Sequence, residues 1–500
     1  MLVRDGVIAA IRPEGYEFDA DKVIDLAGAL LLPGFVDAHA HTTDTGLLLA
    51  GVDCSHARSV TEILDAVADL AKKRPGRQVL GHGWDELNLA EGRPPTAQEL
   101  DRASGGAAVY LSRVDVHSAV VSGTLARAAD LDAHEGWHES GRIEREAHHI
   151  ARHVTRFRIP AAERRELQLL ALRRAAEAGL AELHEMSAPH IAPDEDLLNL
   201  LQIEEPGLPE IVPYRGELAS DESAAREILE RFGGRLAGLA GDLMMDGSFG
   251  SRTAGLSADY ADAHGHRGHL YAHAGQVRDH LVACTKADTQ GGFHVIGDDA
   301  VAELVEGIRQ AAQAVGVSAL RKAAHRLEHV EGISAADAQT LAEMGVIASV
   351  QPAFDAFWGG RKQMYAVRLG AERALAMNPF ADLQRSGVTL AFGSDSPVTP
   401  FAPWEAVRAA LTHHNEGQRL DIGVAIEAHT AGGRRAGRRP EQGLREGDPA
   451  VFAAWTSPGI RVAAAMNVPA PLAALTEELT GGDAVPGLVA SEQRRSPRHR

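Results

Sequence analysis

Two histidines follow a short apolar segment near the amino terminus. Segment 31–36 leads through Asp37 to His39 and His41, which are two residues apart. Successive side chains of a strand point to opposite faces, so the two imidazoles would share one face. Such a pair can supply two nitrogen ligands to one metal ion, each at ~2.0–2.1 Å. Because 24 histidines in 500 residues give roughly one such pair by chance, the pair alone is weak evidence.

Other polar residues end later apolar segments in the same way. His294 lies in segment 291–298, His329 ends segment 326–330, and Asp395 ends segment 388–395. His264 and His266 form a second closely spaced pair, but no strand-like segment precedes them. Four histidines and one carboxylate meeting at one place would form a nitrogen and oxygen site suited to zinc, with iron, manganese or nickel as alternatives.

The elements that would position these residues alternate along the chain. Helix-like segments separate eight strand-like segments, at 31–41, 179–185, 210–215, 241–247, 291–298, 326–330, 346–350 and 388–395. Eight repeats of strand and helix predict an α/β fold of the (β/α)₈ TIM-barrel type. In such a barrel the carboxyl ends of the strands meet at one mouth, where catalytic residues lie.

The remaining segments predict three additions to a barrel spanning residues 31–430. Strand-like segments in 1–30 and 431–475 predict a small β-sandwich domain built from both ends of the chain. Residues from about 79 to 160 interrupt the alternation and are interpreted as an inserted subdomain. The tail, 481–500, is rich in arginine and is expected to be disordered.

The composition limits which partners the protein can bind and which cellular compartment it can occupy. A net charge of −19 argues against nucleic acid or an anionic membrane as a partner. Cys54 and Cys284 cannot form a disulfide framework, and no apolar run is long enough to span a membrane. We therefore expect a cytoplasmic protein with a small-molecule substrate, and we allow for a homodimer.

Several motifs in order make the chemistry more specific. They are 32–41, 246–254, 294–298, Glu328-His329 and 393–398. Together they resemble the amidohydrolase superfamily, in its YtcJ-like or "amidohydrolase 3" branch, which includes N-substituted formamide deformylase. The resemblance extends from about residue 1 to 455.

The resemblance implies a role for each matching position. His39, His41, His294 and His329 would bind a divalent metal, most readily Zn²⁺, as one or two ions. Asp395 would contact the metal and the attacking water, acting first as general base and then as proton donor to the leaving group. This agrees with the chemistry, since zinc lowers the pKa of bound water to ~7 and a neighbouring carboxylate can accept its proton.

One position departs from the family pattern. Relatives usually carry a lysine four residues before the Asp-Gly of the fourth strand, and in many members a carboxylated lysine bridges two metals. Here that position is Asp242, which cannot be carbamylated but can offer an oxygen to a metal. Asp246 and Glu185 are other candidate carboxylates. Asp242 is thus a candidate further ligand, and we favour a single-metal site.

The leading hypothesis is a metal-dependent hydrolase that cleaves a C–N bond in an amide or an N-acyl or N-formyl compound. Alternatives are a metal-dependent isomerase or deaminase, or a catalytically inactive binding protein. The complete set of histidines with Asp395 argues against the inactive alternative. Trp84, Arg252 and Gln351 are candidate substrate-binding residues, and His82 is a further candidate for the pocket.

Overall fold

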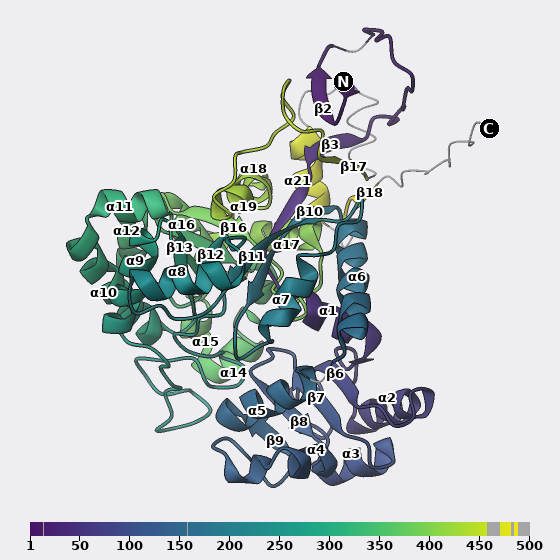
Figure 1. Ribbon diagram of the computed structural model, residues 1–500, viewed down its shortest axis with the longest axis vertical. Helices are drawn as coiled ribbons and strands as arrows, with labels where there is room; N and C mark the ends of the chain where they lie inside the picture. Colours follow the sequence, from purple (N-terminus) through teal and green to yellow (C-terminus); the bar gives the residue numbers. More distant parts are fainter. Residues whose placement is uncertain (14, 158, 458–470, 482–484, 489–500) are drawn as a thin grey trace.

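The computed structural model describes residues 1–13, 15–157, 159–457, 471–481 and 485–488 (Figure 1). Its centre is one sheet in which eight strands pair in parallel with their neighbours. In sheet order, the strands are β4 (Phe35–Ala40), β10 (Leu180–Ser187), β11 (Glu210–Arg215), β12 (Gly238–Leu239), β13 (Gln290–Val295), β14 (Arg326–His329), β15 (Ile347–Val350) and β16 (Thr389–Phe392).

The first and last strands of this sheet meet and close it. Ala40 forms a parallel bridge with Ser396, just beyond β16. The Asp395 N–H donates to the His39 carbonyl at 2.8 Å, and the His41 N–H donates to the Ser396 carbonyl at 2.9 Å. The predicted (β/α)₈ barrel is therefore confirmed.

Helices surround the closed sheet (Figure 1). These helices pack an apolar face against the sheet. In α10 this face is formed by buried side chains at helical spacing, namely Val301, Leu304, Val305 and Ile308. The helices of the barrel region are α1 (Thr42–Ala50), α6 (Ala161–Glu177), α7 (Asp194–Leu200), α8 (Glu222–Arg231), α9 (Ala274–Lys286), α10 (Asp298–Val315), α11 (Val317–Ala323), α12 (Ala335–Met344), α13 (Pro352–Trp358), α14 (Met364–Leu369), α15 (Ala371–Ala374), α16 (Phe380–Ser386), α17 (Pro403–Leu411), α18 (Ile422–Ala428) and α19 (Ala431–Ala436).

The fourth barrel strand differs from its predicted range, 241–247. β12 ends at Leu239, and Gly241 then adopts φ +90°, a left-handed conformation that breaks the extended strand. Beyond this turn only Met244 forms an isolated bridge, to His294. Asp242 consequently lies on the segment that follows the strand, at the carboxyl end of the barrel.

A second sheet lies beside the barrel and has its own hydrophobic cores. Its strands, in order, are β5 (Val52–Asp53), β6 (Val79–Trp84), β7 (Val109–Arg113), β8 (Ser118–Val121) and β9 (Arg142–Glu144). Its helices are α2 (Val60–Lys73), α3 (Ala97–Ser104), α4 (Gly123–Ala128) and α5 (Arg145–Arg156). The sequence predicts that the insertion starts at about residue 79. The sheet begins earlier, because β5 pairs in parallel with β6. We call residues 52–156 the insertion.

One small sheet brings segments from both ends of the chain together, and a separate hairpin lies at the amino terminus. β1 (Leu2–Arg4) and β2 (Val7–Ala10) form a hairpin, and β3 (Leu30–Pro33), β17 (Phe452–Thr456) and β18 (Gly487–Leu488) form a three-stranded sheet. α19 packs instead on the barrel, where Ala436 joins Ala38 and Ala391 in one cluster. Most of the predicted disordered tail, together with 458–470, lies outside the described residues, and β18 is the part of that tail seen in a strand.

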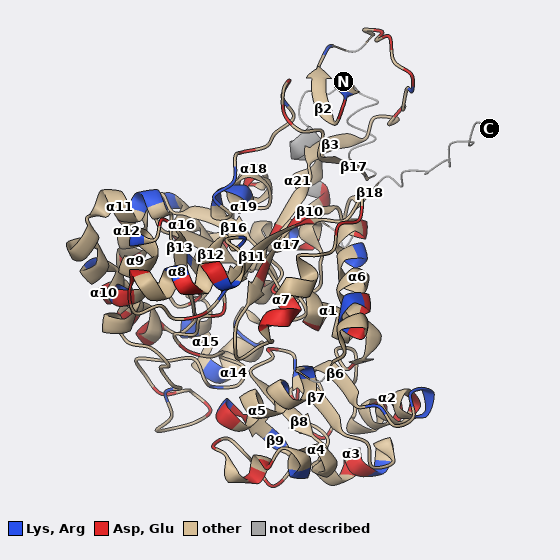
Figure 2. Ribbon diagram, viewed as in Figure 1, with Lys and Arg blue, Asp and Glu red and all other residues tan. Residues whose placement is uncertain are grey.

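Both charge signs are interspersed over the helices, as Figure 2 shows. Among the described helices, none combines the length and the apolar character needed to cross a membrane.

The three-stranded sheet contacts the barrel through Trp455, which provides a stability test. A Cβ atom at Gly179 (φ +80°) would lie 2.5 Å from the Trp455 ring, whereas one at Gly207 (φ +87°) would meet nothing within 4 Å. We expect Gly207→Ala to cost about 1 kcal/mol from backbone strain alone. Gly179→Ala should cost about 2–4 kcal/mol, because overpacking adds to that strain. Urea unfolding of both variants measures the difference, and equal losses would contradict the Trp455 contact.

Candidate metal centre

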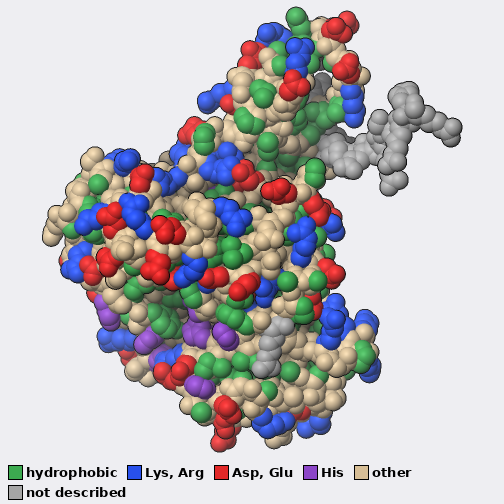
Figure 3. All heavy atoms as spheres, viewed as in Figure 1, with side chains coloured by type: hydrophobic (Ala, Val, Ile, Leu, Met, Phe, Trp, Pro, Cys, Tyr) green, Lys and Arg blue, Asp and Glu red, His purple; other side chains and the backbone are tan. Residues whose placement is uncertain are grey.

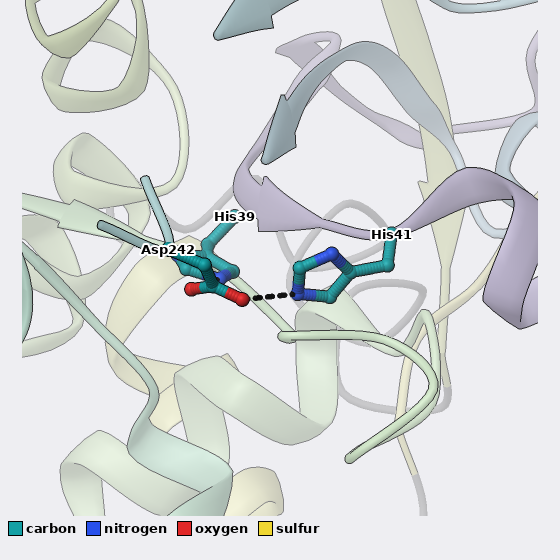
Figure 4. A group of neighbouring side chains, drawn as sticks. All are labelled: His39, His41 and Asp242. Carbon is teal, nitrogen blue, oxygen red and sulfur yellow. Dashed lines mark ion pairs between the residues drawn. The ribbon is translucent and has the colours of Figure 1, made fainter. Parts of the chain in front are cut away.

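Six side chains converge at the carboxyl ends of the barrel strands. His39 and His41 come from β4 and the residue after it, His294 from β13 and His329 from the end of β14. Asp242 and Asp395 follow β12 and β16. Figure 4 shows His39, His41 and Asp242 pointing toward one another. Residues that are far apart in the sequence therefore form one group of buried imidazoles and carboxylates.

The spacing of four donors fits a metal ion. His39 Nε2 lies 3.4 Å from one oxygen of both Asp242 and Asp395, and His41 Nε2 lies 3.3 Å and 3.2 Å from an oxygen of each. Two neighbouring ligands ~2.0–2.1 Å from one zinc ion in a tetrahedral site are roughly 3.3–3.4 Å apart, so each of these imidazole–carboxylate pairs is spaced like two such ligands. His39 Nε2 and Asp242 Oδ1 are buried and have no hydrogen-bond partner among the described residues. The donor set thus fits a divalent cation.

Asp242 also reaches the other two histidines. The donors form three overlapping groups of three residues. Within each group, the ligand atoms all lie within 4.8 Å of one another. The groups are His39 with His41 and Asp242, His39 with His329 and Asp395, and Asp242 with His294 and His329. The carboxylate at the position of the family's lysine therefore lies between two pairs of histidines.

Charge holds both aspartates of this group in the ionised form. Burial alone would raise their pKa values. The attraction of His41 and His39 outweighs burial at Asp242 and lowers its pKa well below the usual range. His39 and His41 likewise lower the pKa of Asp395. Carboxylates in this state can bind a cation or accept a proton.

A further layer of residues orients two of the imidazoles. His39 Nδ1 lies 2.9 Å from Glu328 Oε2, and Glu328 is also paired with the buried Arg326 at 2.6 Å. Burial opposes ionisation of Glu328, but Arg326 and His39 lower its pKa to about 2. His39 Nδ1 therefore donates to a carboxylate, which leaves Nε2 free to act as a ligand. His329 Nδ1 lies 2.8 Å from Gln351 Oε1 and is oriented in the same way.

The other candidate carboxylates have structural partners. Asp246 accepts backbone N–H groups from Gly255, Ile296 and Gly297 at 2.7–2.9 Å, and burial raises its pKa to about 7. Glu185 accepts the N–H and the hydroxyl of Thr42 at 2.8 and 2.5 Å. Neither carboxylate belongs to the donor groups found among the described residues.

The structure places the predicted substrate residues away from the cavity beside the donors. Trp84 is buried in the insertion, where its indole N–H donates to Leu111 O at 2.8 Å, and His82 bonds there with Ser112 at 2.9 Å. Arg252 is paired with Asp262 at 2.7 Å. These three side chains and Gln351 do not line that cavity, and Gln351 acts through His329 instead.

The insertion supplies two residues that the sequence reasoning missed. Asp115 and His117 line the cavity together with His294, His329 and Asp395. Their only sequence signal is that they follow the strand-like segment 107–112 directly. Histidines also gather on the surface between barrel and insertion (Figure 3), where His149, His153, His190 and His269 help line a cavity of about 400 Å³. They form none of the donor groups found in the described chain.

Several residues at or near the donors have a strained backbone. His329, Val330 and Asp395 have φ values of +72°, +54° and +55°, in the left-handed region. Val116 in the insertion has φ +53°. This region is unfavourable for residues with a Cβ, especially β-branched ones, and such strain clusters at functional sites. The site is thus held in a geometry that the chain would not adopt locally.

The chain is similar to several known proteins. YtcJ of Bacillus subtilis (strain 168) is 24% identical over 86% of this chain and 85% of its own length. The N-substituted formamide deformylase of Arthrobacter pascens is 29% identical over 29% of this chain and 28% of its own. An uncharacterized metal-dependent hydrolase from Pyrococcus furiosus superposes with a TM-score of 0.66 at 25% identity, covering 86% of this chain and 88% of its own.

The family model described as "Amidohydrolase family" matches residues 22–477, which include the barrel, the insertion and all six converging side chains. Together with the closed eight-stranded sheet, this match shows that the chain belongs to the amidohydrolase family.

Proposed function

We propose that the protein is a metal-dependent hydrolase that cleaves a C–N bond in an amide or an N-acyl or N-formyl compound. The observation that carries this proposal is the group of donors at 3.2–3.4 Å formed by His39, His41, Asp242 and Asp395. The name of the Arthrobacter relative, a formamide deformylase, supports the choice of bond.

His39, His41 and Asp242 would hold one ion, and Asp395 would contact both that ion and its bound water. His294 and His329, with Asp242 shared between them and the first pair, offer three donors for a second ion. Zinc is the metal that suits this mixture of imidazole nitrogens and carboxylate oxygens. Bound there, it would lower the pKa of a coordinated water to ~7 and polarise the carbonyl of the substrate.

Asp395 is the proposed general base. Its backbone is fixed by the hydrogen bond to His39, and its carboxylate stays ionised beside His39 and His41. It lines the cavity, so it can accept a proton from the attacking water and then deliver that proton to the leaving nitrogen. Glu328 and Gln351 keep the imidazoles of His39 and His329 oriented throughout.

Replacing Asp395 tests this assignment. We expect Asp395→Asn to lower kcat for N-acyl and N-formyl amines by at least ~10², because an amide cannot accept the proton. Amine release is measured together with bound metal and the unfolding temperature. Undiminished turnover in a folded, metal-loaded variant would contradict the role of Asp395.

The shared carboxylate can be tested by counting metal ions. We expect the wild type loaded with Zn²⁺ to hold two ions per chain and Asp242→Ala to hold at most one, because each position loses a donor. Elemental analysis after gel filtration gives the ratio, and circular dichroism confirms the fold. An unchanged ratio would remove Asp242 from the ligand set.

Removal of the metal tests the proposal as a whole. We expect dialysis against a chelator to abolish amide hydrolysis and added Zn²⁺ to restore it, since the donors alone do not activate water. Activity that survives complete metal removal would overturn the proposed function.

A further inference from the structure

The turn between β7 and β8 carries the insertion to the donor cluster. Asp115 and His117 of this turn line the same cavity as His294, His329 and Asp395. The His117 and His294 ring centroids are 5.4 Å apart. A part of the chain outside the barrel therefore forms one wall of the proposed active site.

Hydrogen bonds lock this turn onto the barrel. The Asp115 carboxylate accepts from Ser248 Oγ at 2.7 Å and from Ser251 Oγ at 2.9 Å. Its other partner is Arg113, at 3.1 Å. Asp115 Oδ1 also accepts the His117 N–H, at 3.3 Å. The backbone that carries His117 is thus fixed relative to the loop that follows β12.

The residue before His117 is strained. Val116 is β-branched and has φ +53°. Its N–H donates to Arg113 O at 3.0 Å, and its carbonyl accepts from Arg152 at 2.7 Å. A β-branched residue persists in this conformation only where its surroundings impose it, and such positions cluster at functional sites. The result of the strain is the placement of His117 against the cavity.

Carboxyl and hydroxyl groups make up much of the polar lining of the cavity. Asp115, Glu331 and Asp395 contribute carboxyl groups to its lining. The hydroxyl groups of Ser248 and Tyr365 already donate to Asp115 and Glu331. A substrate carbonyl that develops negative charge gains from a donor in addition to the proposed metal, and these two hydroxyl groups are already engaged.

His117 is the side chain that meets this need. Its ring lies in the cavity lining, and a neutral imidazole carries one N–H donor. Trp358 also carries an indole N–H, but its ring packs on Phe354 at 4.9 Å within an aromatic cluster. His117 lies beside His294, next to the position where bond cleavage is proposed.

We propose that His117 is a catalytic residue that donates a hydrogen bond from its ring to the acyl oxygen of the substrate. The proposal rests on the hydrolase function proposed above. It assigns to the insertion a direct part in the reaction, in addition to its packing against the barrel.

Three variants of the full-length, metal-loaded protein test this role. His117→Leu removes the donor, His117→Asn keeps one, and His138→Leu changes an exposed histidine of the same insertion as a matched control. We expect His117→Leu to lower kcat for N-acyl and N-formyl amines by ~10²–10³ with a much smaller change in KM, as for other lost oxyanion donors. His117→Asn should recover at least about tenfold of that loss, and His138→Leu should match the wild type.

A binding measurement provides a readout that does not depend on turnover. Phenylphosphonate carries tetrahedral oxygens similar to those of an attacked carbonyl. We expect calorimetry to show binding about tenfold weaker in His117→Leu than in the wild type, with recovery in His117→Asn. Bound metal and unfolding temperature are measured for each variant.

The outcomes separate this inference from the proposed function. Turnover and phosphonate affinity in His117→Leu within about threefold of the wild type would overturn the inference and leave the hydrolase proposal intact. Loss of metal from His117→Leu would also overturn it, because the effect would then act through the donors. If no amide is hydrolysed but phosphonate binding depends on His117, the hydrolase proposal fails and the contact with an oxyanion stands.

Discussion

The closure of the barrel is the constraint on which the rest of the structure depends. Two backbone hydrogen bonds, from Asp395 to His39 and from His41 to Ser396, join the first strand to the segment after the last. Both hydrogen bonds are made by residues that belong to the donor cluster or lie next to it. The same contacts therefore fix the fold and the site. A weakened closure would move the Asp395 carboxylate away from both imidazoles and lengthen both of its donor distances together.

Closure alone would not keep so many polar groups buried. The interior of the barrel also holds Arg326, whose guanidinium group binds Glu328, His184 and the carbonyl of Ala38 and lies 4.6 Å from the Tyr214 ring centroid. An isolated charge in this position would be costly, and a fully partnered one is tolerated. The contacts from Arg326 through Glu328 to His39 therefore hold the His39 imidazole in a fixed orientation at the carboxyl end of the barrel.

Local patterns in the sequence predicted the barrel and five polar residues at four of its strand ends, because strand periodicity and segment order are local properties. The fourth strand was misplaced, since the turn at Gly241 separates Asp242 from a strand only two residues long. Asp115 and His117 were missed for a different reason. Their approach to His294 depends on how the insertion docks through Ser248 and Ser251, which no local pattern contains. Trp84 and Arg252 were given substrate roles, although the structure shows partners that already occupy them.

The left-handed residues around the site have a consequence for how such a protein changes over time. Val116, Val330 and Asp395 each hold a conformation that glycine or asparagine would adopt more readily. Selection for heat resistance alone would favour those smaller or more permissive residues at these positions. The result would be a more stable but less active barrel. The same substitutions would relax the backbone that positions the reacting groups. The strain thus sets a limit on how far stability and turnover can be improved together.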